Sequence, residues 1–337
     1  MRPTCHLRDL ATETIEISPA VTASAPAALF PEGALEKITG LSPWRSWPVE
    51  DPLIKGGAIS HLATLAHIVE DTAIFGPMVY KEGAKYDVGF GEERIWQQIT
   101  SPSTTLDEAA LVSCYAGSRF FGPFLKDSLP QELLPQDTAK MISLRTKPYS
   151  HEDGYRTLFG LPAPPVIDVA RVKRLTFYDD IGQNAGKAAR LHSLRERLRQ
   201  TLNAAGQDRP KGVYLKRGNT GEARTLVNEA TLEKCLKDLG FDIVEPARLP
   251  ADEIARRTLD APIVISIEGS HISHAVYSMA TTGTLLVVQP PDRFAMAFKE
   301  FTDQIGIRFA FFVGDAAPGG FSVNMDAFQR FLERATP

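Results

Sequence analysis

The sequence predicts an α/β fold with two domains. From Lys211 to the C-terminus, short and nearly continuous apolar segments alternate with amphipathic segments of helical length. This alternation is typical of a parallel sheet that is covered by helices on both faces. The chain has 337 residues, which corresponds to roughly two domains of about 150 residues. We therefore expect one domain over 1–182 and a Rossmann-like domain over 183–337.

The C-terminal half predicts five strands and five helices in alternation. Strands are expected where apolar residues stand together, and helices where apolar residues recur at helical spacing. The predicted strands are 211–217, 241–247, 262–267, 284–291 and 308–313, and the predicted helices are 225–240, 250–260, 270–283, 292–306 and 325–335. A long amphipathic helix over 184–206 precedes them and is placed to connect the two domains.

The N-terminal half has a less regular pattern. Residues 18–31 are small and Pro-rich without a period, so they predict a loop or linker. Residues 72–90 predict a hairpin, and residues 110–116 predict a buried strand that leads into a kinked helix, in which Phe and Leu recur around two prolines. A further strand is expected over 139–146.

Composition and charge exclude several classes of protein. The net charge is −4, so an overall basic field is absent and we expect no nucleic-acid partner. The three cysteines lie far apart without a CxxC pair, which excludes a disulfide framework or a zinc ribbon. No apolar run approaches the roughly 18 residues needed to cross a bilayer. Charged residues near the N-terminus argue against a signal peptide, so a cytoplasmic location is expected.

Cationic side chains gather after the first strand of the C-terminal half. Lys216, Arg217 and Arg224 follow this strand, and Gly218 allows the backbone to bend close to a ligand. Ligands bind at the carboxyl ends of strands in open α/β sheets, and guanidinium groups suit bidentate contact with phosphate. The segment predicts a diphosphate site; the alternative is a solvated basic loop.

A second polar segment follows the third strand of this half. It contains Glu268, Gly269, Ser270, His271 and His274. A carboxylate beside a glycine turn can accept hydrogen bonds from ribose or sugar hydroxyls. The two histidines are three residues apart, whereas the helical zinc motif HExxH separates them by four. We therefore predict histidines that cap a helix or contact a ligand, and no metal site.

Two further residues complete the candidate set. Asp292 is a suitable N-cap for the predicted helix that it opens, so Arg293 would lie at a helix start, where it either contacts the ligand or forms an ion pair. Asp127 lies in the apolar kinked helix, which suits a general base; the alternative is a helix-surface or capping residue.

Familiar nucleotide and hydrolase motifs are absent. The segment 182–189 differs from a P-loop in its glycine spacing and lacks Ser or Thr after Lys187. No GxGxxG motif follows a predicted strand, and no GxSxG motif occurs. These absences argue against a dehydrogenase and against an α/β-hydrolase.

Several of these segments together resemble glycosyltransferase family 61. Its stretch of Arg…Arg…Asn-Glu is matched by Arg217, Arg224, Asn228 and Glu229. The run over 240–290 is similar to the family's order of strands and helices, and FFGPFLKDSLPQELL at 120–134 is similar to a family segment with Asp before Leu-Pro. The family has His-Gly-Ala-Gly where this chain has 268–271, an Asn at His274 and a histidine at Pro123, so the donor sugar and the base do not transfer from the resemblance alone.

The resemblance implies an inverting enzyme of the GT-B type, in which two Rossmann-like domains face a cleft and the last helix often returns to the first domain. A nucleotide sugar would bind the C-terminal domain and a saccharide or glycan acceptor the N-terminal domain. Within this scheme we predict Asp127 as the base, from its position in the apolar kinked helix. No DxD motif stands in a strand-end loop, so no metal and no other cofactor is expected. The family also implies bacterial capsule or surface-polysaccharide synthesis, compatible with peripheral association with membrane assembly machinery.

Two other functions stay open. A catalytically silent binding protein would keep the same architecture, and the departures at Pro123 and Glu268 are consistent with it. A sugar-nucleotide epimerase or hydrolase of GT-B shape would use the same donor site. Hydrolysis of donor without acceptor, and the identity of the product, separate these functions.

Overall fold

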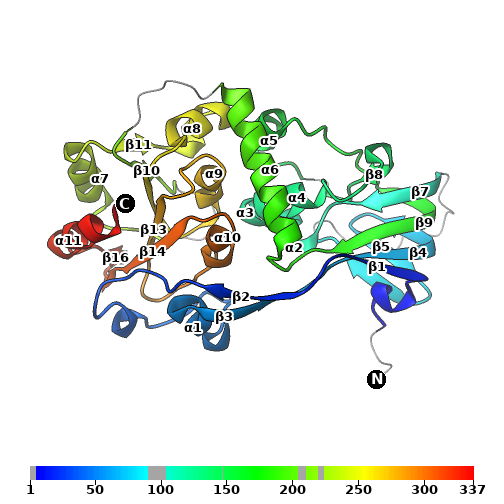
Figure 1. Cartoon of the computed structure of the whole chain (residues 1–337), viewed down its shortest axis with the longest axis horizontal. Helices are drawn as coiled ribbons and strands as arrows, with labels where there is room; N and C mark the ends of the chain where they lie inside the picture. Colours follow the sequence, from blue (N-terminus) through cyan, green and yellow to red (C-terminus); the bar gives the residue numbers. More distant parts are fainter. Residues whose placement is uncertain (1–4, 90–103, 146, 204–209, 219–223) are drawn as a thin grey trace. The chain divides into compact units, whose positions relative to one another are not determined.

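The computed structural model of the chain describes residues 5–89, 104–145, 147–203, 210–218 and 224–337 (Figure 1). The chain divides into two compact units. The first comprises Met1–Val21 and His61–Leu191, and the second comprises Thr22–Ser60 and His192–Pro337. The segment 22–60, from the N-terminal half of the sequence, therefore belongs to the C-terminal unit.

A five-stranded parallel sheet forms the centre of the second unit. Its strands stand in the order β11-β10-β12-β13-β14, with bounds Asp242–Val244, Val213–Leu215, Ile263–Ile267, Thr284–Gln289 and Arg308–Val313. Every residue of β12 and β13 is buried, as expected for strands covered on both faces. The parallel sheet predicted for the C-terminal half is confirmed.

Helices connect these strands, and several are shorter than predicted. The predicted helices at 225–240, 250–260 and 325–335 are present as α7 (Glu229–Asp238), α8 (Ala251–Thr258) and α11 (Met325–Ala335). The segment after β12 forms only the 3₁₀ turn η7 (Ser270–Ile272) and α9 (Ser273–Val276), and the segment after β13 becomes helical only at α10 (Lys299–Gln304). The 3₁₀ turn η6 (Pro246–Arg248) and a hairpin of β15 (Asp315–Ala317) and β16 (Gly320–Ser322) complete this part.

The last helix, α11, packs against the core of its own unit. Phe328 and Phe331 lie within 5.4 and 6.1 Å of the Phe312 ring, measured between ring centroids. Both side chains belong to a buried cluster with Tyr214 and Ile265. The apolar face of the helix is thus used within the second unit.

The segment 18–31, predicted to be a loop or linker, contains a strand. β2 (Val21–Ala25) pairs with β3 (Gly57–His61), and the turn η2 (Leu35–Lys37) and helix α1 (Trp47–Lys55) lie between them. Leu29 also exchanges backbone hydrogen bonds of 3.0 and 2.9 Å with Phe309 and Phe311 of β14. The strands that pair with this segment, β3 and β14, are distant in the sequence. Its extended conformation therefore depends on tertiary pairing and is not visible as a local periodic pattern.

Tertiary pairing also explains why residues 292–298 are not helical. The backbone N–H of Phe294 donates to Gly40 at 2.9 Å, and that of Ser42 donates to Phe294 at 3.0 Å. The buried carboxylate of Glu50 accepts a hydrogen bond of 2.7 Å from the N–H of Met296. These bonds hold an irregular backbone, so Asp292 is not a helix N-cap and Arg293 does not begin a helix, contrary to the prediction.

The first unit contains a mixed seven-stranded sheet instead of the Rossmann-like sheet expected for the N-terminal half. Its order is β6-β5-β4-β9-β7-β8, with β1 on β4, and the bounds are β1 Glu13–Ser18, β4 Thr64–Phe75, β5 Met78–Lys81, β6 Ala84–Asp87, β7 Thr105–Leu111, β8 Met141–Ile142 and β9 Val169–Asp179. β4 is antiparallel to β1, β5 and β9, whereas β7 is parallel to β8 and β9. Tight turns join β4 to β5 and β5 to β6, and such turns require antiparallel strands.

Helical segments of the first unit follow β7 with only one interruption. These are α2 (Tyr115–Arg119), α3 (Phe121–Pro123), the π-helical turn η4 (Phe124–Ser128) and α4 (Leu129–Gln131), so the predicted kinked helix is confirmed. The other helical elements among the residues described for this unit are η1 (Leu7–Leu10), η5 (Thr138–Lys140), α5 (Glu152–Phe159) and α6 (Ala185–Leu202), and the division between the units falls within α6. No helix in the described part of the chain is long and apolar enough to span a membrane.

Candidate functional site

The topology of the second unit identifies one place for a ligand. After β10 the chain passes through α7 to β11 on one side, and then through α8 to β12 on the other side of β10. The carboxyl ends of β10 and β12 therefore flank the topological switch point, where open α/β sheets bind their ligands. Arg217 follows β10, and Glu268 and Gly269 follow β12.

The structure brings Arg217, Arg224 and Glu268 together at this point. Arg217 Nη1 donates a hydrogen bond of 2.8 Å to the backbone carbonyl of Glu268, and Arg224 Nη1 approaches the same oxygen at 3.4 Å. Arg224 Nε and Glu268 Oε2 form an ion pair at 2.8 Å, with side chains that are 11% and 9% exposed. Two guanidinium groups and one carboxylate thus share a largely desolvated corner of the sheet.

Gly269 is required for this arrangement. Its φ is 155°, and a Cβ at this position would lie 2.0 Å from Arg217 Nη1 and 3.0 Å from His271 Nδ1. Contacts below about 3 Å do not occur between a Cβ and another heavy atom without displacement of one of them. The missing side chain therefore allows Arg217 to pass over the backbone that follows β12.

His271 is a neutral side chain close enough to both arginines to respond to their charge. Its Nε2 lies 2.6 Å from Ser266 Oγ, which in turn donates to the carbonyl of Leu215. Burial, followed by the charges of Arg217 and Arg224, lowers the pKa of His271 from 6.5 to about 3. At neutral pH His271 therefore adds no positive charge beside the arginines.

The other predicted residues of the polar segment after β12, Ser270 and His274, differ in their exposure to solvent. Ser270 opens the turn η7 and is partly exposed, whereas His274 is 3% exposed within α9. Arg293 lies in the turn after β13 and is partly exposed. Among the residues that the structure describes, no group of three or more His, Cys, Asp or Glu side chains is placed to hold a metal ion.

Asn228 and Glu229 support the fold beneath the site. The Asn228 amide donates to the carbonyl of Val323 at 2.8 Å and accepts from its N–H at 3.0 Å. Glu229 accepts a hydrogen bond of 2.8 Å from the hydroxyl of Tyr214 on β10. Lys216 forms an ion pair of 2.6 Å with Glu233 of α7. These side chains hold β10, β16 and α7 together, and they do not join the cluster of Arg217 and Arg224.

Asp127 lies in the first unit, in the π-helical turn η4. π-helical turns are rare and are frequent at functional sites. Lys187 Nζ donates to Asp127 Oδ1 at 2.6 Å, and the Asp127 side chain is 18% exposed whereas that of Lys187 is 0% exposed. The candidate base is therefore paired with a fully buried cation.

The sequence does not predict the pairing of Lys187 with Asp127. Lys187 lies in the segment 182–189, which fails as a P-loop. It precedes Leu191 by four residues, and Leu191, Leu194 and Leu198 form the buried stripe of α6. A lysine on the apolar stripe of a helix was the available signal, because such a lysine must be paired inside the protein.

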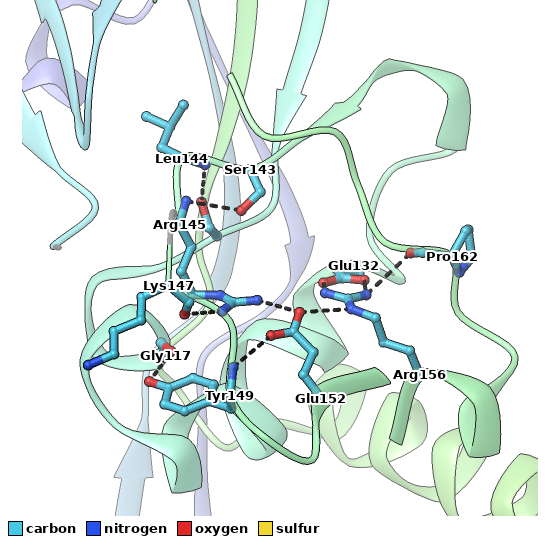
Figure 2. Close-up of polar contacts among 11 residues, drawn as sticks. Gly117, Glu132, Ser143, Leu144, Arg145, Lys147, Tyr149, Glu152, Arg156 and Pro162 are labelled. Carbon is cyan, nitrogen blue, oxygen red and sulfur yellow. Dashed lines mark hydrogen bonds and ion pairs between the residues drawn. The ribbon is translucent and has the colours of Figure 1, made fainter. Parts of the chain in front are cut away.

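A buried ionic network holds both ends of the helical run that carries Asp127 (Figure 2). Before η4, the hydroxyl of Tyr149 donates to the carbonyl of Gly117 in α2 at 3.0 Å. After α4, Glu132 accepts two hydrogen bonds of 2.8 Å from Arg156. Glu152 links the two sides, because its carboxylate contacts Arg156, Arg145 and the N–H of Tyr149.

The comparisons with known proteins place this chain in a family context. Residues 121–286 match the family model described as Glycosyltransferase 61. The match includes Asp127, Lys187 and the cluster of Arg217, Arg224 and Glu268. Among curated proteins, the search finds no match.

Proposed function

The chain belongs to glycosyltransferase family 61, and on this premise we propose that it transfers a sugar, with inversion, from a nucleotide-sugar donor to a saccharide or glycan acceptor. Donor binding is assigned to the second unit, because this unit carries the parallel sheet with a switch point. The acceptor is assigned to the first unit, which carries Asp127.

The convergence of Arg217 and Arg224 on Glu268 carries this proposal. Two guanidinium groups at the end of a parallel sheet match the diphosphate of a nucleotide sugar, since they can each contact two phosphate oxygens. Low exposure of Arg224 strengthens its interaction with a bound anion. When phosphate binds Arg224, the Glu268 carboxylate becomes available to ribose or sugar hydroxyls.

The proposed chemistry is a single displacement. The acceptor hydroxyl gives its proton to the Asp127 carboxylate while its oxygen forms a bond to the anomeric carbon of the donor. The bond between that carbon and the diphosphate breaks at the same time, and the electron pair leaves with the nucleoside diphosphate. Arg217 and Arg224 stabilise the charge that develops on the leaving group.

We also propose that this reaction proceeds without a metal ion. The two guanidinium groups supply the positive charge that a divalent cation provides at other nucleotide-sugar sites. Transfer should therefore persist in excess EDTA. A complete loss of transfer that Mn²⁺ restores would contradict this part of the proposal.

The cellular setting that we propose follows from the family resemblance. The enzyme would act in the cytoplasm on a bacterial capsule or surface polysaccharide, in peripheral association with membrane assembly machinery. Transfer to capsule fragments or lipid-linked saccharides, in preference to free monosaccharides, would support this setting.

The central test measures donor binding and transfer in one matched pair of variants. Arg224→Gln should weaken donor binding roughly 10- to 100-fold, because hydrogen bonds to charged groups contribute about 1.5–3 kcal/mol. Arg248→Gln is the control, since Arg248 lies in the same unit but is 78% exposed and pairs with Glu245. Binding is measured by thermal shift with a panel of nucleotide sugars, and transfer by product analysis.

Three results would contradict the proposal. Equal donor binding by the Arg224 and Arg248 variants would remove the arginine cluster from the donor site. Donor binding without transfer to any acceptor, and without donor hydrolysis, would identify a silent binding protein. Free sugar or an isomerised nucleotide sugar as the sole product would identify a hydrolase or an epimerase.

A further inference from the structure

We propose that Lys187 is a positioning residue for Asp127: its buried ammonium holds one carboxylate oxygen and leaves the other to receive the proton of the acceptor. This inference rests on the proposed function, in which Asp127 is the base. It deepens that function by assigning a role to a residue that does not touch substrate.

The ammonium of Lys187 donates its hydrogen bonds to Asp127 and to the residue that follows β9. The side chain is 0% exposed, and Nζ donates to Asp127 Oδ1 at 2.6 Å and to the carbonyl of Asp180 at 2.8 Å. A buried ion pair contributes little net stability compared with apolar residues of similar volume. Fixing the orientation of Asp127 therefore explains the buried lysine better than stability does.

The backbone of Lys187 is itself held in place. Asn184 caps the start of α6, because its Oδ1 accepts the N–H of Lys187 at 3.1 Å. The Asn184 amide donates to the carbonyl of Leu62 at 3.0 Å and to Thr64 Oγ1 at 2.9 Å. The backbone of Lys187 is thus anchored to the beginning of β4 through Asn184.

The π-helical turn that carries Asp127 is equally constrained. Ser128 Oγ lies 3.3 Å from Cys114 Sγ, and Sγ also accepts the N–H of Gly117 at 3.4 Å. A Cβ on Gly117 would lie 2.0 Å from Ser128 Oγ, so the turn packs directly on the backbone of α2. Burial, followed by the charge of Asp127, raises the pKa of the Cys114 thiol, so this thiol stays neutral beside the carboxylate.

The two carboxylate oxygens of Asp127 therefore differ. Within the described part of the chain, hydrogen bonds to this carboxylate reach only Oδ1. Lys187 is fully buried while the Asp127 side chain is 18% exposed, so the solvent contact of this ion pair belongs to Asp127. A base needs one accessible oxygen held at a fixed angle, and we assign this role to Oδ2, because Oδ1 is held by Lys187.

The test compares turnover with donor binding in Lys187→Met. We expect kcat to fall roughly 10- to 100-fold. This decrease is no larger than the roughly 100-fold or greater decrease in kcat expected when a general base itself is removed. The donor KM and the donor-induced thermal shift should stay at the wild-type values, because the arginine cluster is untouched. Glu196→Gln is the matched control: Glu196 lies on the same helix at an exposed position and contacts Gln200, so its kcat should remain near wild type.

A second set of variants keeps the test decisive if Lys187→Met does not fold. The double variant Asp127→Asn with Lys187→Met removes both charges of the pair and should have the same residual kcat as Asp127→Asn alone, since Lys187 acts only through Asp127. Lys187→Arg, which retains a cation, should keep part of the turnover that Lys187→Met loses.

The outcomes separate this inference from the proposed function. Wild-type kcat in Lys187→Met, or a further large loss of kcat when it is added to Asp127→Asn, would overturn the positioning role alone. No transfer by the wild type, or normal turnover by Asp127→Asn, would overturn the proposed function or its base, and the inference with it.

Discussion

At the scale of single residues, Gly269 shows how one missing side chain determines the geometry of the site. Its backbone passes so close to Arg217 that a Cβ would lie 2.0 Å from Nη1. Arg217 also donates a hydrogen bond to the backbone carbonyl of Glu268, the residue before Gly269. The guanidinium therefore has a defined position before any ligand binds, which reduces the side-chain entropy lost on binding.

The charge state of His271 leads to a prediction about pH. Its pKa is lowered from 6.5 to about 3, first by burial and then by Arg217 and Arg224. Between these values the unfolded chain binds a proton that the folded protein does not bind, so the free energy of unfolding falls as pH falls from about 6.5 towards 3. The contribution is fully present above pH 6.5 and has a slope of at most about 1.4 kcal/mol per pH unit.

Urea unfolding of wild type and His271→Asn at pH 7 and pH 5 measures this contribution. The wild type should lose more stability than the variant over this interval, because only the wild type carries the depressed histidine. Parallel pH dependences of the two proteins would contradict the burial of a neutral His271 near the arginines.

At the scale of elements, the short helix α9 depends on a side chain from α6. The guanidinium of Arg195 donates to the carbonyls of Val276 and Met279, which lie at the end of α9 and just after it. Burial lowers the pKa of Arg195 to about 10, so the side chain still carries its charge at neutral pH. A helix of one turn cannot form alone, and this contact supplies partners for its last carbonyls.

Arg195→Met should therefore destabilise the protein by about 2–5 kcal/mol, since two buried carbonyls lose their donors. Chemical unfolding measures the change, with Gln200→Met, at an exposed position of the same helix, as the control. A change in the Arg195 variant no larger than that in the Gln200 variant would show that α9 does not need this cap.

At the scale of the whole molecule, the proposed donor site and the proposed base belong to separate units of the chain. Addition of a nucleoside diphosphate should therefore slow amide hydrogen exchange at 213–218 and 264–274 in the second unit, because the ligand contacts the ends of β10 and β12. The hairpins of 64–87 in the first unit serve as the internal control. Slower exchange confined to the first unit would contradict the assignment of the donor to the second.

The sequence by itself determined the central sheet of the second unit and the residues at its strand ends. Strands that are buried on both faces must be nearly continuous apolar segments, and β12 and β13 therefore appear clearly in a local pattern. The switch-point rule then places Arg217 and Glu268 at the same edge. Neither inference requires knowledge of distant contacts.

Only the tertiary structure decided which residues that are distant in the sequence contact one another. Asp127 and Lys187 are 60 residues apart in the sequence. Gly40 and Phe294, which form a backbone hydrogen bond, come from two segments of the second unit that are far apart in the sequence. The mixed sheet of the first unit likewise depends on which strands meet across long connections. Local periodicity reports which face of an element is buried but not which distant group covers it, so these contacts leave no readable pattern in the sequence.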